Sequence, residues 1–308
     1  MRNAEISLGR ACEPDRSLWR CSSPVRPPPE PATGPETFVP RLPRRRFSEL
    51  VLPASTRRTI ETLLSRVRNH DLLYGEWELG TIDPVGRHKT VSFYGPPGTG
   101  KTQCAEALAA ELGQPIIEVD YAAIESKYVG ETPKNIRAAF EAARSAGAVL
   151  FFDEADSILG RRLTQVTQAA DQAVNVSRAV LLKELDAFDG VVVFATNLAR
   201  NFDSAFVRRI LLHVEVPLPD AEGRRLLWQR MISDRVPGRE EIDWDRLTEA
   251  SQGFSGGDIK NAVVLCLAAA ADRTDAARRI TLEDGLEAIR HVRRAKEEVE
   301  PGSHVSCE

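Results

Sequence analysis

The segment GPPGTGKT at residues 95–102 constrains the fold of this chain more than any other stretch. It follows the short apolar run TVSFY (90–94) and precedes a helical stretch at 101–112. The segment matches the pattern G-x-x-x-x-G-K-[ST], whose glycines let successive backbone N–H groups point at one anion, while the helix adds its positive end. We therefore predict a loop that holds phosphate groups, made of Gly95, Pro96, Pro97, Gly98, Thr99, Gly100, Lys101 and Thr102.

Two side chains of this loop have predicted roles. Lys101 is expected to neutralise β- and γ-phosphate oxygens, and Thr102 to bind Mg²⁺. The alternative is a glycine-rich turn that holds no ligand. The strand before the loop and the helix after it favour the phosphate interpretation.

Short apolar runs alternate with longer helical stretches over residues 90–216. Strands that alternate with helices form βαβ units, and near-continuous apolar strands suit a sheet that is buried on both faces. The predicted fold is therefore α/β, a P-loop NTPase parallel sheet with helices on both faces. The strand-like runs lie at 90–94, 115–119, 148–152, 191–195 and 211–216, and the helical stretches between them include 101–112, 133–146 and 169–187.

After residue 219 the pattern becomes helical, which predicts a small all-α lid domain over residues 220–296. The segments SGGD (255–258) and TLED (281–284) each place a hydroxyl three residues before a carboxylate, which approximates a capping box at a helix start. The α/β domain is expected over 47–219 and a flexible tail over 297–308. Residues 1–46 hold nine of the nineteen prolines and predict a disordered arm, either a solvated tail or a recruitment arm.

Composition argues against several classes of protein, although the overall charge leaves a local basic patch open. The 41 basic and 45 acidic residues give a net charge of −4, which argues against a basic nucleic-acid-binding protein. No apolar stretch approaches the roughly 20 residues that span a bilayer, so no membrane span is expected. The five cysteines form no CxxC pair, which favours reduced thiols and a cytoplasmic location.

Polar residues follow two further strand-like runs. Asp153 and Glu154 end the apolar run in VLFFDEAD (149–156), and Asn197 ends FATN (194–197). Because parallel strands deliver their last residues to one edge of the sheet, Asp153 is expected to hold Mg²⁺, Glu154 to activate water and Asn197 to contact the γ-phosphate. The alternatives are a helix cap or surface pair for the two acids, and an ordinary strand end for the asparagine.

Together these residues resemble the AAA+ ATPases, in the AAA clade that remodels proteins, over about residues 47–295. The resemblance implies ATP hydrolysis with Mg²⁺ in a ring of identical subunits. It also identifies ESKYVGETPKNIR (125–137) as similar to a pore loop, in which Tyr128 grips a threaded polypeptide beside Lys127, Val129 and Gly130. An aromatic side chain suits contact with varied sequences. A buried core tyrosine is the alternative.

The segment FDSAFVRRI (202–210) lies where family members carry arginines that reach the next subunit's nucleotide. An always-charged planar donor suits the charge that develops on a transferred phosphoryl group. Here the longer R-P-G-R-F-D run is missing and the arginines are adjacent, so on a helix they point about 100° apart. Arg208 is favoured slightly over Arg209, and a plain surface pair remains the alternative.

Two further segments resemble parts of the family that contact the nucleotide. GFSGGDI (253–259) is similar to the second sensor of the lid, where Gly256 and Gly257 are expected to contact the nucleotide by backbone. DLLYGEW (71–77) lies where relatives hold the adenine, which makes Tyr74 and Gly75 candidates.

The resemblance predicts an ATP-dependent motor that unfolds or remodels proteins. Its partners are expected to be further copies of the chain, as a hexamer, and a protein substrate or adaptor. The first alternative is a DNA-associated motor or loader, which calls for a basic stripe. The second is a nucleotide-gated scaffold with little turnover, against which the intact Asp153–Glu154 pair argues. A fused protease is disfavoured because no HExxH occurs.

Overall fold

The computed structural model describes residues 38–82, 89–120, 131–160, 169–197, 202–274 and 277–299. All of them belong to one of the two compact units of the chain, residues 36–308. Within them, no helix is long and apolar enough to cross a membrane. The predicted pore-loop residues Lys127, Tyr128, Val129 and Gly130 lie outside the described residues.

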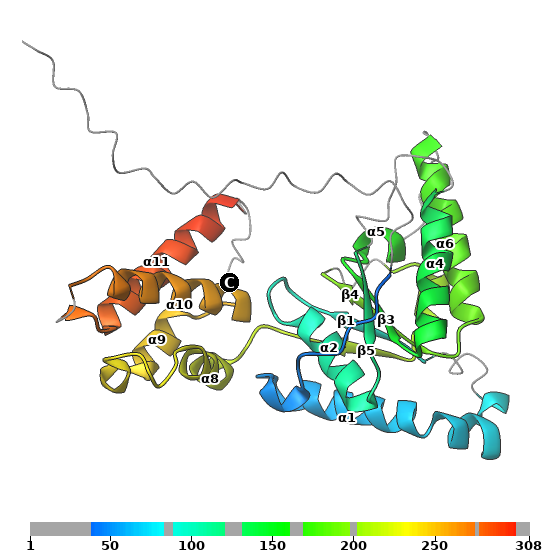
Figure 1. Cartoon of the computed structure of the whole chain (residues 1–308), viewed down its shortest axis with the longest axis horizontal. Helices are drawn as coiled ribbons and strands as arrows, with labels where there is room; N and C mark the ends of the chain where they lie inside the picture. Colours follow the sequence, from blue (N-terminus) through cyan, green and yellow to red (C-terminus); the bar gives the residue numbers. More distant parts are fainter. Residues whose placement is uncertain are drawn as a thin grey trace, which may run out of the picture. The chain divides into compact units, whose positions relative to one another are not determined.

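A parallel five-stranded sheet confirms the predicted fold class (Figure 1). Its strand order is β2-β3-β4-β1-β5. The register pairs Tyr94 with Thr196 and Phe152 with Phe194, so the carboxyl ends of the three central strands lie at one edge. The strands are β1 (Lys89–Tyr94), β2 (Ile116–Asp120), β3 (Val149–Asp153), β4 (Val191–Thr196) and β5 (Leu212–Glu215).

Helices cover both faces of this sheet, with α1 and α2 on one side and α4 and α6 on the other (Figure 1). Strand β3 shows why, because its alternate residues face opposite cores. Leu150 and Phe152 pack with α4 and α6, whereas Val149 and Phe151 pack with α1 and α2. The helices of this domain are α1 (Ala54–Arg68), α2 (Lys101–Leu112), α4 (Glu131–Ala146), α5 (Asp156–Leu159), α6 (Ala169–Asp186) and α7 (Ser204–Val207), with short turns at Phe47–Glu49, Leu72–Glu76 and Leu79–Thr81.

The chain pairs with the sheet before the predicted start of the domain. Arg41 and Ile116 exchange backbone hydrogen bonds of 2.9 and 2.8 Å at the edge strand β2. The Arg41 side chain donates to Glu118 at 2.7 Å. The prediction of an N-terminal arm up to residue 46 did not anticipate these contacts, because they join residues more than 70 positions apart.

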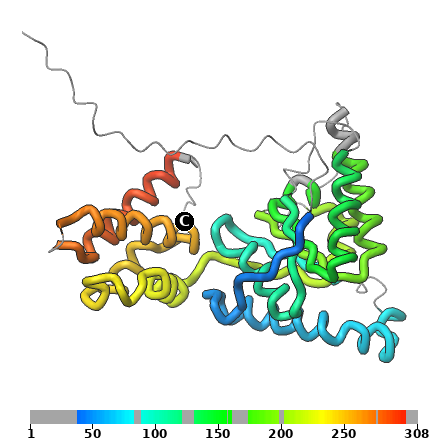
Figure 2. The backbone as a smooth tube through the Cα atoms, viewed as in Figure 1, coloured from blue at the N-terminus to red at the C-terminus, as the bar shows by residue number. Residues whose placement is uncertain are grey.

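After β5 the chain continues into four helices with their own core, which Figure 2 follows from yellow to red. Trp228, Leu247 and Ile259 are buried at its centre. Both predicted capping boxes are present. Ser255 Oγ accepts from the Asp258 N–H, and Thr281 Oγ1 accepts from the Asp284 N–H, with each aspartate accepting in return. The elements are α8 (Ala221–Met231), α9 (Trp244–Ala250), α10 (Gly256–Ala271) and α11 (Leu282–Val299), with a short turn at Arg239–Glu241.

Candidate active site

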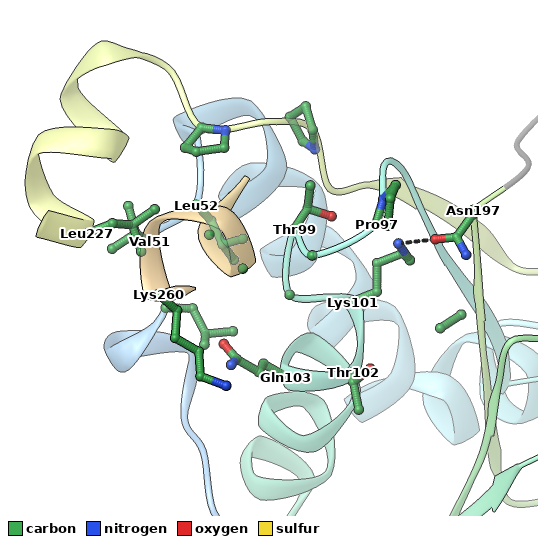
Figure 3. A pocket seen from close by; sticks show the side chains of 18 of the residues that line it. Val51, Leu52, Pro97, Thr99, Lys101, Thr102, Gln103, Asn197, Leu227 and Lys260 are labelled. Atoms are coloured by element: carbon green, nitrogen blue, oxygen red, sulfur yellow. Dashed lines mark hydrogen bonds between the residues drawn. The ribbon is translucent and has the colours of Figure 1, made fainter. Parts of the chain in front are cut away.

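A cavity of about 440 Å³ lies at the edge of the sheet where β1, β3 and β4 end (Figure 3). The residues around it come from four parts of the chain. The α/β domain contributes the predicted loop from Pro97 to Thr102 together with Asp153, Glu154 and Asn197. The helix α10 contributes Gly256, Gly257 and Lys260, and the segment Leu50–Pro53 lies before α1. The fourth part is α8 with the segment before it, which contributes Pro217, Pro219, Leu227 and Met231.

The loop conformation depends on its glycines. Gly98 and Gly100 have φ angles of 72° and 98°, in the left-handed region that other residues adopt only at a cost. A Cβ atom on Gly98 would lie 2.7 Å from Ser255 Oγ, and one on Gly95 would lie 2.2 Å from the Val216 carbonyl oxygen. Space and backbone angle thus both require glycine, and the loop is shaped so that α2 begins at Lys101.

Lys101 is buried and its ammonium group has three partners. Nζ donates to the carbonyl oxygens of Gly95 at 2.9 Å and Pro96 at 2.8 Å, and to Asn197 Oδ1 at 2.7 Å (Figure 3). Burial lowers the pKa of Lys101, although the charges of Asp153 and Asp156 act in the opposite direction. The ammonium group of the loop is therefore in direct contact with Asn197, the residue that follows β4.

A hydroxyl and a carboxylate meet beside this lysine. Thr102 Oγ1 donates to Asp153 Oδ2 at 2.8 Å, joining the start of α2 to the end of β3. Hard oxygen ligands of this kind suit Mg²⁺, which takes few protein ligands and shares the others with phosphate and water. The residues present thus fit the predicted ion.

Glu154 has an unusual backbone for a residue with a side chain. Its φ angle is 49°, and its N–H donates to Asp153 Oδ1 at 2.9 Å. Left-handed geometry in a non-glycine residue costs free energy and is concentrated at functional sites. Glu154 lines the cavity and is exposed rather than buried in the sheet.

The structure separates the two predicted arginines. Arg209 is held by Asp186, the last residue of α6, through bonds of 2.6 and 2.8 Å, and it also donates to the Ala205 carbonyl. Arg208 is exposed, and within the described part of the chain its side chain makes no hydrogen bond or ion pair. Arg208 is thus available to a second molecule, and Arg209 is engaged within its own.

Tyr74 and Gly75 do not line this cavity. They belong to the short helix Leu72–Glu76, where the Tyr74 ring stacks on His70 with centroids 4.7 Å apart. The segment before α1 that reaches the cavity is Leu50–Pro53 instead. The helix α1, 15 residues long, lies between the two segments in the sequence.

Sequence reasoning missed three features of the site. Lys260 of α10 lines the cavity, as does the segment Leu50–Pro53. Asp156 accepts hydrogen bonds from the Thr196 hydroxyl and the Asn197 N–H, the latter at 3.0 Å. For Asp156 a signal was present, because it is the last acid of the quoted run VLFFDEAD.

Comparisons with known proteins agree with this geometry. Residues 91–218 match the model of the "ATPase family associated with various cellular activities (AAA)". The 26S proteasome regulatory subunit S10B homolog B of Arabidopsis thaliana is 33% identical over 228 residues, which cover 71% of this chain and 56% of that protein. The proteasome-activating nucleotidase of Saccharolobus solfataricus is 35% identical over 222 residues, which cover 70% and 54%. The chain thus spans about half the length of these curated relatives.

A solved structure has the same fold. The crystal structure of the FIGL-1 AAA domain in complex with ADP superposes with a TM-score of 0.64, covering 81% of this chain and 85% of that one at 24% identity. Family model, relatives and fold agree with the motifs that the cavity brings together. The chain therefore carries an AAA ATPase domain that is homologous to those of proteasomal ATPases.

Proposed function

We propose that this chain hydrolyses ATP and uses the energy to remodel or unfold proteins. The observation that carries the proposal is the meeting of Lys101, Thr102, Asp153 and Asn197 at one sheet edge, within 2.8 Å of one another in pairs. These are the residue types that position a triphosphate in P-loop enzymes. The likeness to a proteasome-activating nucleotidase supports a protein substrate.

In this proposal the phosphate groups lie along the loop from Gly98 to Thr102. The N–H groups of the loop and of the first turn of α2 donate hydrogen bonds to the negatively charged phosphate oxygens. The ammonium of Lys101 moves from the carbonyls of Gly95 and Pro96 to these oxygens. Thr102 and Asp153 would hold Mg²⁺, which supplies charge neutralisation to the β- and γ-phosphates. Asn197 is positioned to contact the γ-phosphate or the attacking water.

Glu154 accepts the proton of the attacking water. It follows the Mg²⁺-binding Asp153 directly, and its left-handed turn places the exposed carboxylate at the cavity. The positive charge that the transition state still needs comes from Arg208 of an adjacent copy. Arg208 rather than Arg209 takes this role because Asp186 already neutralises Arg209 within its own molecule.

The assembly in this proposal is a ring, with six copies as the expected number. Tyr128, flanked by Lys127, Val129 and Gly130, grips the polypeptide as subunits change nucleotide state. The lid contacts the loop through the Gly257 N–H, which donates to the Gly98 carbonyl at 2.9 Å. Closure of the lid would therefore shift the loop that binds the phosphate groups. The buried free thiols of Cys104 and Cys266 fit the proposed cytoplasmic location.

The experiment compares Glu154→Gln with Tyr128→Ala. Glu154→Gln should retain ATP binding and lose at least about 100-fold in turnover, since general-base catalysis contributes at least this factor. Tyr128→Ala should retain ATPase activity and lose unfolding of a tagged substrate protein. Normal turnover in Glu154→Gln would remove the proposed base, and normal unfolding in Tyr128→Ala would remove threading by this residue. A wild-type protein that binds ATP without turnover would favour the scaffold.

A further inference from the structure

Asp156 holds the end of strand β4 although it does not line the cavity itself. It is the first residue of α5, and its carboxylate accepts from the Asn197 N–H at 3.0 Å and from the Thr196 hydroxyl. The Ala155 N–H adds a bond of 3.0 Å to the Ala195 carbonyl. Asn197, the proposed γ-phosphate contact, is therefore fixed on its backbone side by the start of α5.

The other end of α5 is attached to the segment that precedes α7. The Leu159 carbonyl accepts from the Asp203 N–H at 2.8 Å, and Gly160 forms a bridge with Phe202. Ile158 and Leu159 are fully buried in the core between the sheet, α4 and α6. The short helix α5 thus connects the end of β4 to Asp203. Because Ile158 and Leu159 are closely packed in the core, α5 cannot shift much without disturbing that packing.

Asp203 in turn caps the short helix α7, which ends directly before Arg208. Its carboxylate caps α7 by accepting from the Ala205 N–H at 2.9 Å. Phe206 is buried in the same core as Leu159, and the Arg208 N–H donates to the Ser204 carbonyl at 3.3 Å. The orientation of α7, and with it the direction of Arg208, therefore depends on where α5 holds Asp203.

We infer that Asp156 is a positioning residue that couples Asn197, in a subunit's own site, to Arg208, which serves the next subunit. The inference rests on the proposed function. Asn197 contacts a group that hydrolysis removes, and a contiguous set of hydrogen bonds and buried residues leads from its backbone to Arg208. A subunit's nucleotide would in this way set whether its neighbour hydrolyses.

The experiment measures ATP hydrolysis by a few wild-type subunits in a large excess of donor subunits that carry Glu154→Gln. Such donors contribute no turnover but still offer Arg208, so only the effect on the neighbour is seen. Donors with the second substitution Asp156→Ala should lower turnover of each wild-type subunit about ten-fold, the loss typical of one bond to a charged group. Donors with Asp156→Asn keep an acceptor oxygen and should restore most of it.

Two further donors give the reference values. Donors with Glu154→Gln and Arg208→Ala give the turnover that remains when no arginine is supplied. Donors with Glu154→Gln and Asp189→Ala should leave turnover unchanged, because Asp189 is an exposed residue before β4. If Asp156→Ala donors support normal turnover while Arg208→Ala donors do not, the coupling is wrong and the proposed function stands. If Arg208→Ala donors also support normal turnover, the proposed arginine in trans is wrong, and the coupling falls with it.

A second variant covers the case in which Asp156→Ala does not fold. Asp203 has φ −64° and ψ 133°, which proline also adopts, so Asp203→Pro keeps these backbone angles while it removes the N–H that bonds to Leu159 and sets the ring Cδ against that carbonyl oxygen. Asp203→Ala removes only the helix cap. Turnover that is lower with Asp203→Pro donors than with Asp203→Ala donors supports the link through α5, and equal turnover contradicts it.

Discussion

The two sides of the cavity are built differently. On the α/β side, polar side chains hold one another directly, since the buried Lys101 donates to Asn197 at 2.7 Å and the half-buried Thr102 donates to Asp153 at 2.8 Å. On the lid side, a hydrogen bond between backbones reaches the loop, from the Gly257 N–H to the Gly98 carbonyl at 2.9 Å. Two glycines at the start of α10 allow this approach, since a Cβ atom on Gly257 would lie 3.3 Å from Gly98.

This difference assigns different tasks to the two domains. Catalysis benefits from polar groups that are held near one another before the substrate binds, and the sheet edge holds Lys101 beside Asn197 and Thr102 beside Asp153. In the proposed mechanism the lid moves relative to the loop, and small residues with few bonds suit such a movement, because these bonds can be broken and remade without leaving buried charges unpaired. Substitutions on the α/β side should therefore lower the affinity for ATP more than substitutions in the lid do.

The largest effect is expected from Lys101→Ala. The variant removes the buried cation that contacts both the loop carbonyls and Asn197, so we expect ATP affinity to fall by at least about 100-fold, the equivalent of roughly 3 kcal/mol. Isothermal titration calorimetry with ATP and Mg²⁺ measures it. Lys183→Ala, at an exposed position of α6, is the matched control. An unchanged ATP affinity in Lys101→Ala would contradict the claim that the α/β side contributes most of the ATP binding.

A smaller effect is expected where the two sides meet, at Gly98. Gly98→Ala would place Cβ 2.7 Å from Ser255 Oγ in addition to the cost of a φ angle of 72°, and we expect about ten-fold weaker ATP binding. Gly113→Ala is a matched control, because Gly113 has φ 67° but open space around it. It should lose about 1 kcal/mol of stability and keep its ATP affinity. Equal ATP affinities in both variants would show that the contact with the lid is unimportant.

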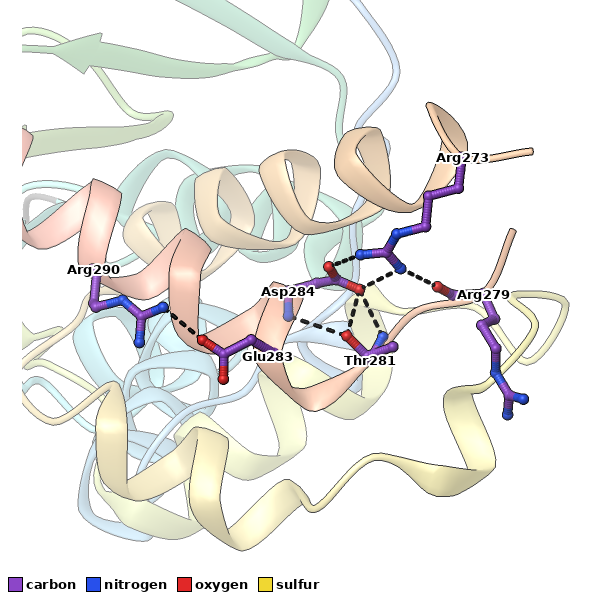
Figure 4. A network of polar contacts seen from close by, with 6 residues as sticks. All are labelled: Arg273, Arg279, Thr281, Glu283, Asp284 and Arg290. Atoms are coloured by element: carbon purple, nitrogen blue, oxygen red, sulfur yellow. Dashed lines mark hydrogen bonds and ion pairs between the residues drawn. The ribbon is translucent and has the colours of Figure 1, made fainter. Parts of the chain in front are cut away.

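The stability of the lid should depend on pH. Burial raises the pKa of Asp284, but hydrogen bonds from Arg273 and Thr281 outweigh burial, so the pKa lies below the ordinary value of 3.8 (Figure 4). A carboxyl group with a lowered pKa stabilises the folded state above its unfolded pKa, and this contribution is lost as the pH falls through the folded value.

Asp284→Asn tests this dependence. Urea unfolding should show the variant less stable than wild type at neutral pH, and the difference should shrink as the pH falls below 3.8. Because Asp284 lies in the lid and away from the cavity lining, ATP affinity at neutral pH should change little. A stability difference that grows on acidification would contradict the lowered pKa.

The smallest effect is expected from a single helix cap. Thr281→Ala removes the hydroxyl that accepts from the Asp284 N–H at the start of α11, and should cost about 1 kcal/mol of unfolding free energy. Thr62→Ala, an exposed position within α1 whose hydroxyl only donates to the Arg58 carbonyl, should cost less. Equal unfolding free energies in the two variants would show that the cap contributes nothing, and ATPase activity should survive in both.

Local patterns were sufficient to predict the parts of the molecule that depend on local chemistry. The phosphate loop, the five strands and both capping boxes follow from spacing and residue type within a few positions. The sequence could not predict pairs that form across long separations. Asp186 engages Arg209 from 23 positions away, and Asp156 reaches Asn197 from 41, so the difference between Arg208 and Arg209 became clear only from the fold.

The placement of Tyr74 illustrates the same limit. The sequence places DLLYGEW just upstream of the loop, yet proximity in sequence is not proximity in space. The helix α1 has Leu50–Pro53 at its start and Leu72–Glu76 beyond its end, and only the first of these segments lines the cavity. The sequence did not indicate that Leu50 and Leu52 line the cavity, because apolar residues are also expected in the core. Leu50 is indeed part of the core, and Leu52 packs against it.

The central claim is that the α/β side of one subunit is completed by Arg208 of another, and a mixing experiment tests it most directly. Glu154→Gln subunits lack the base but carry Arg208, and Arg208→Ala subunits carry the base but lack the arginine. Each preparation alone should hydrolyse ATP at a small fraction of the wild-type rate. We predict that mixing them restores turnover well above the sum of the two, because mixed neighbours contain one complete site. Turnover that stays at that sum, or full activity of Arg208→Ala alone, would contradict the account.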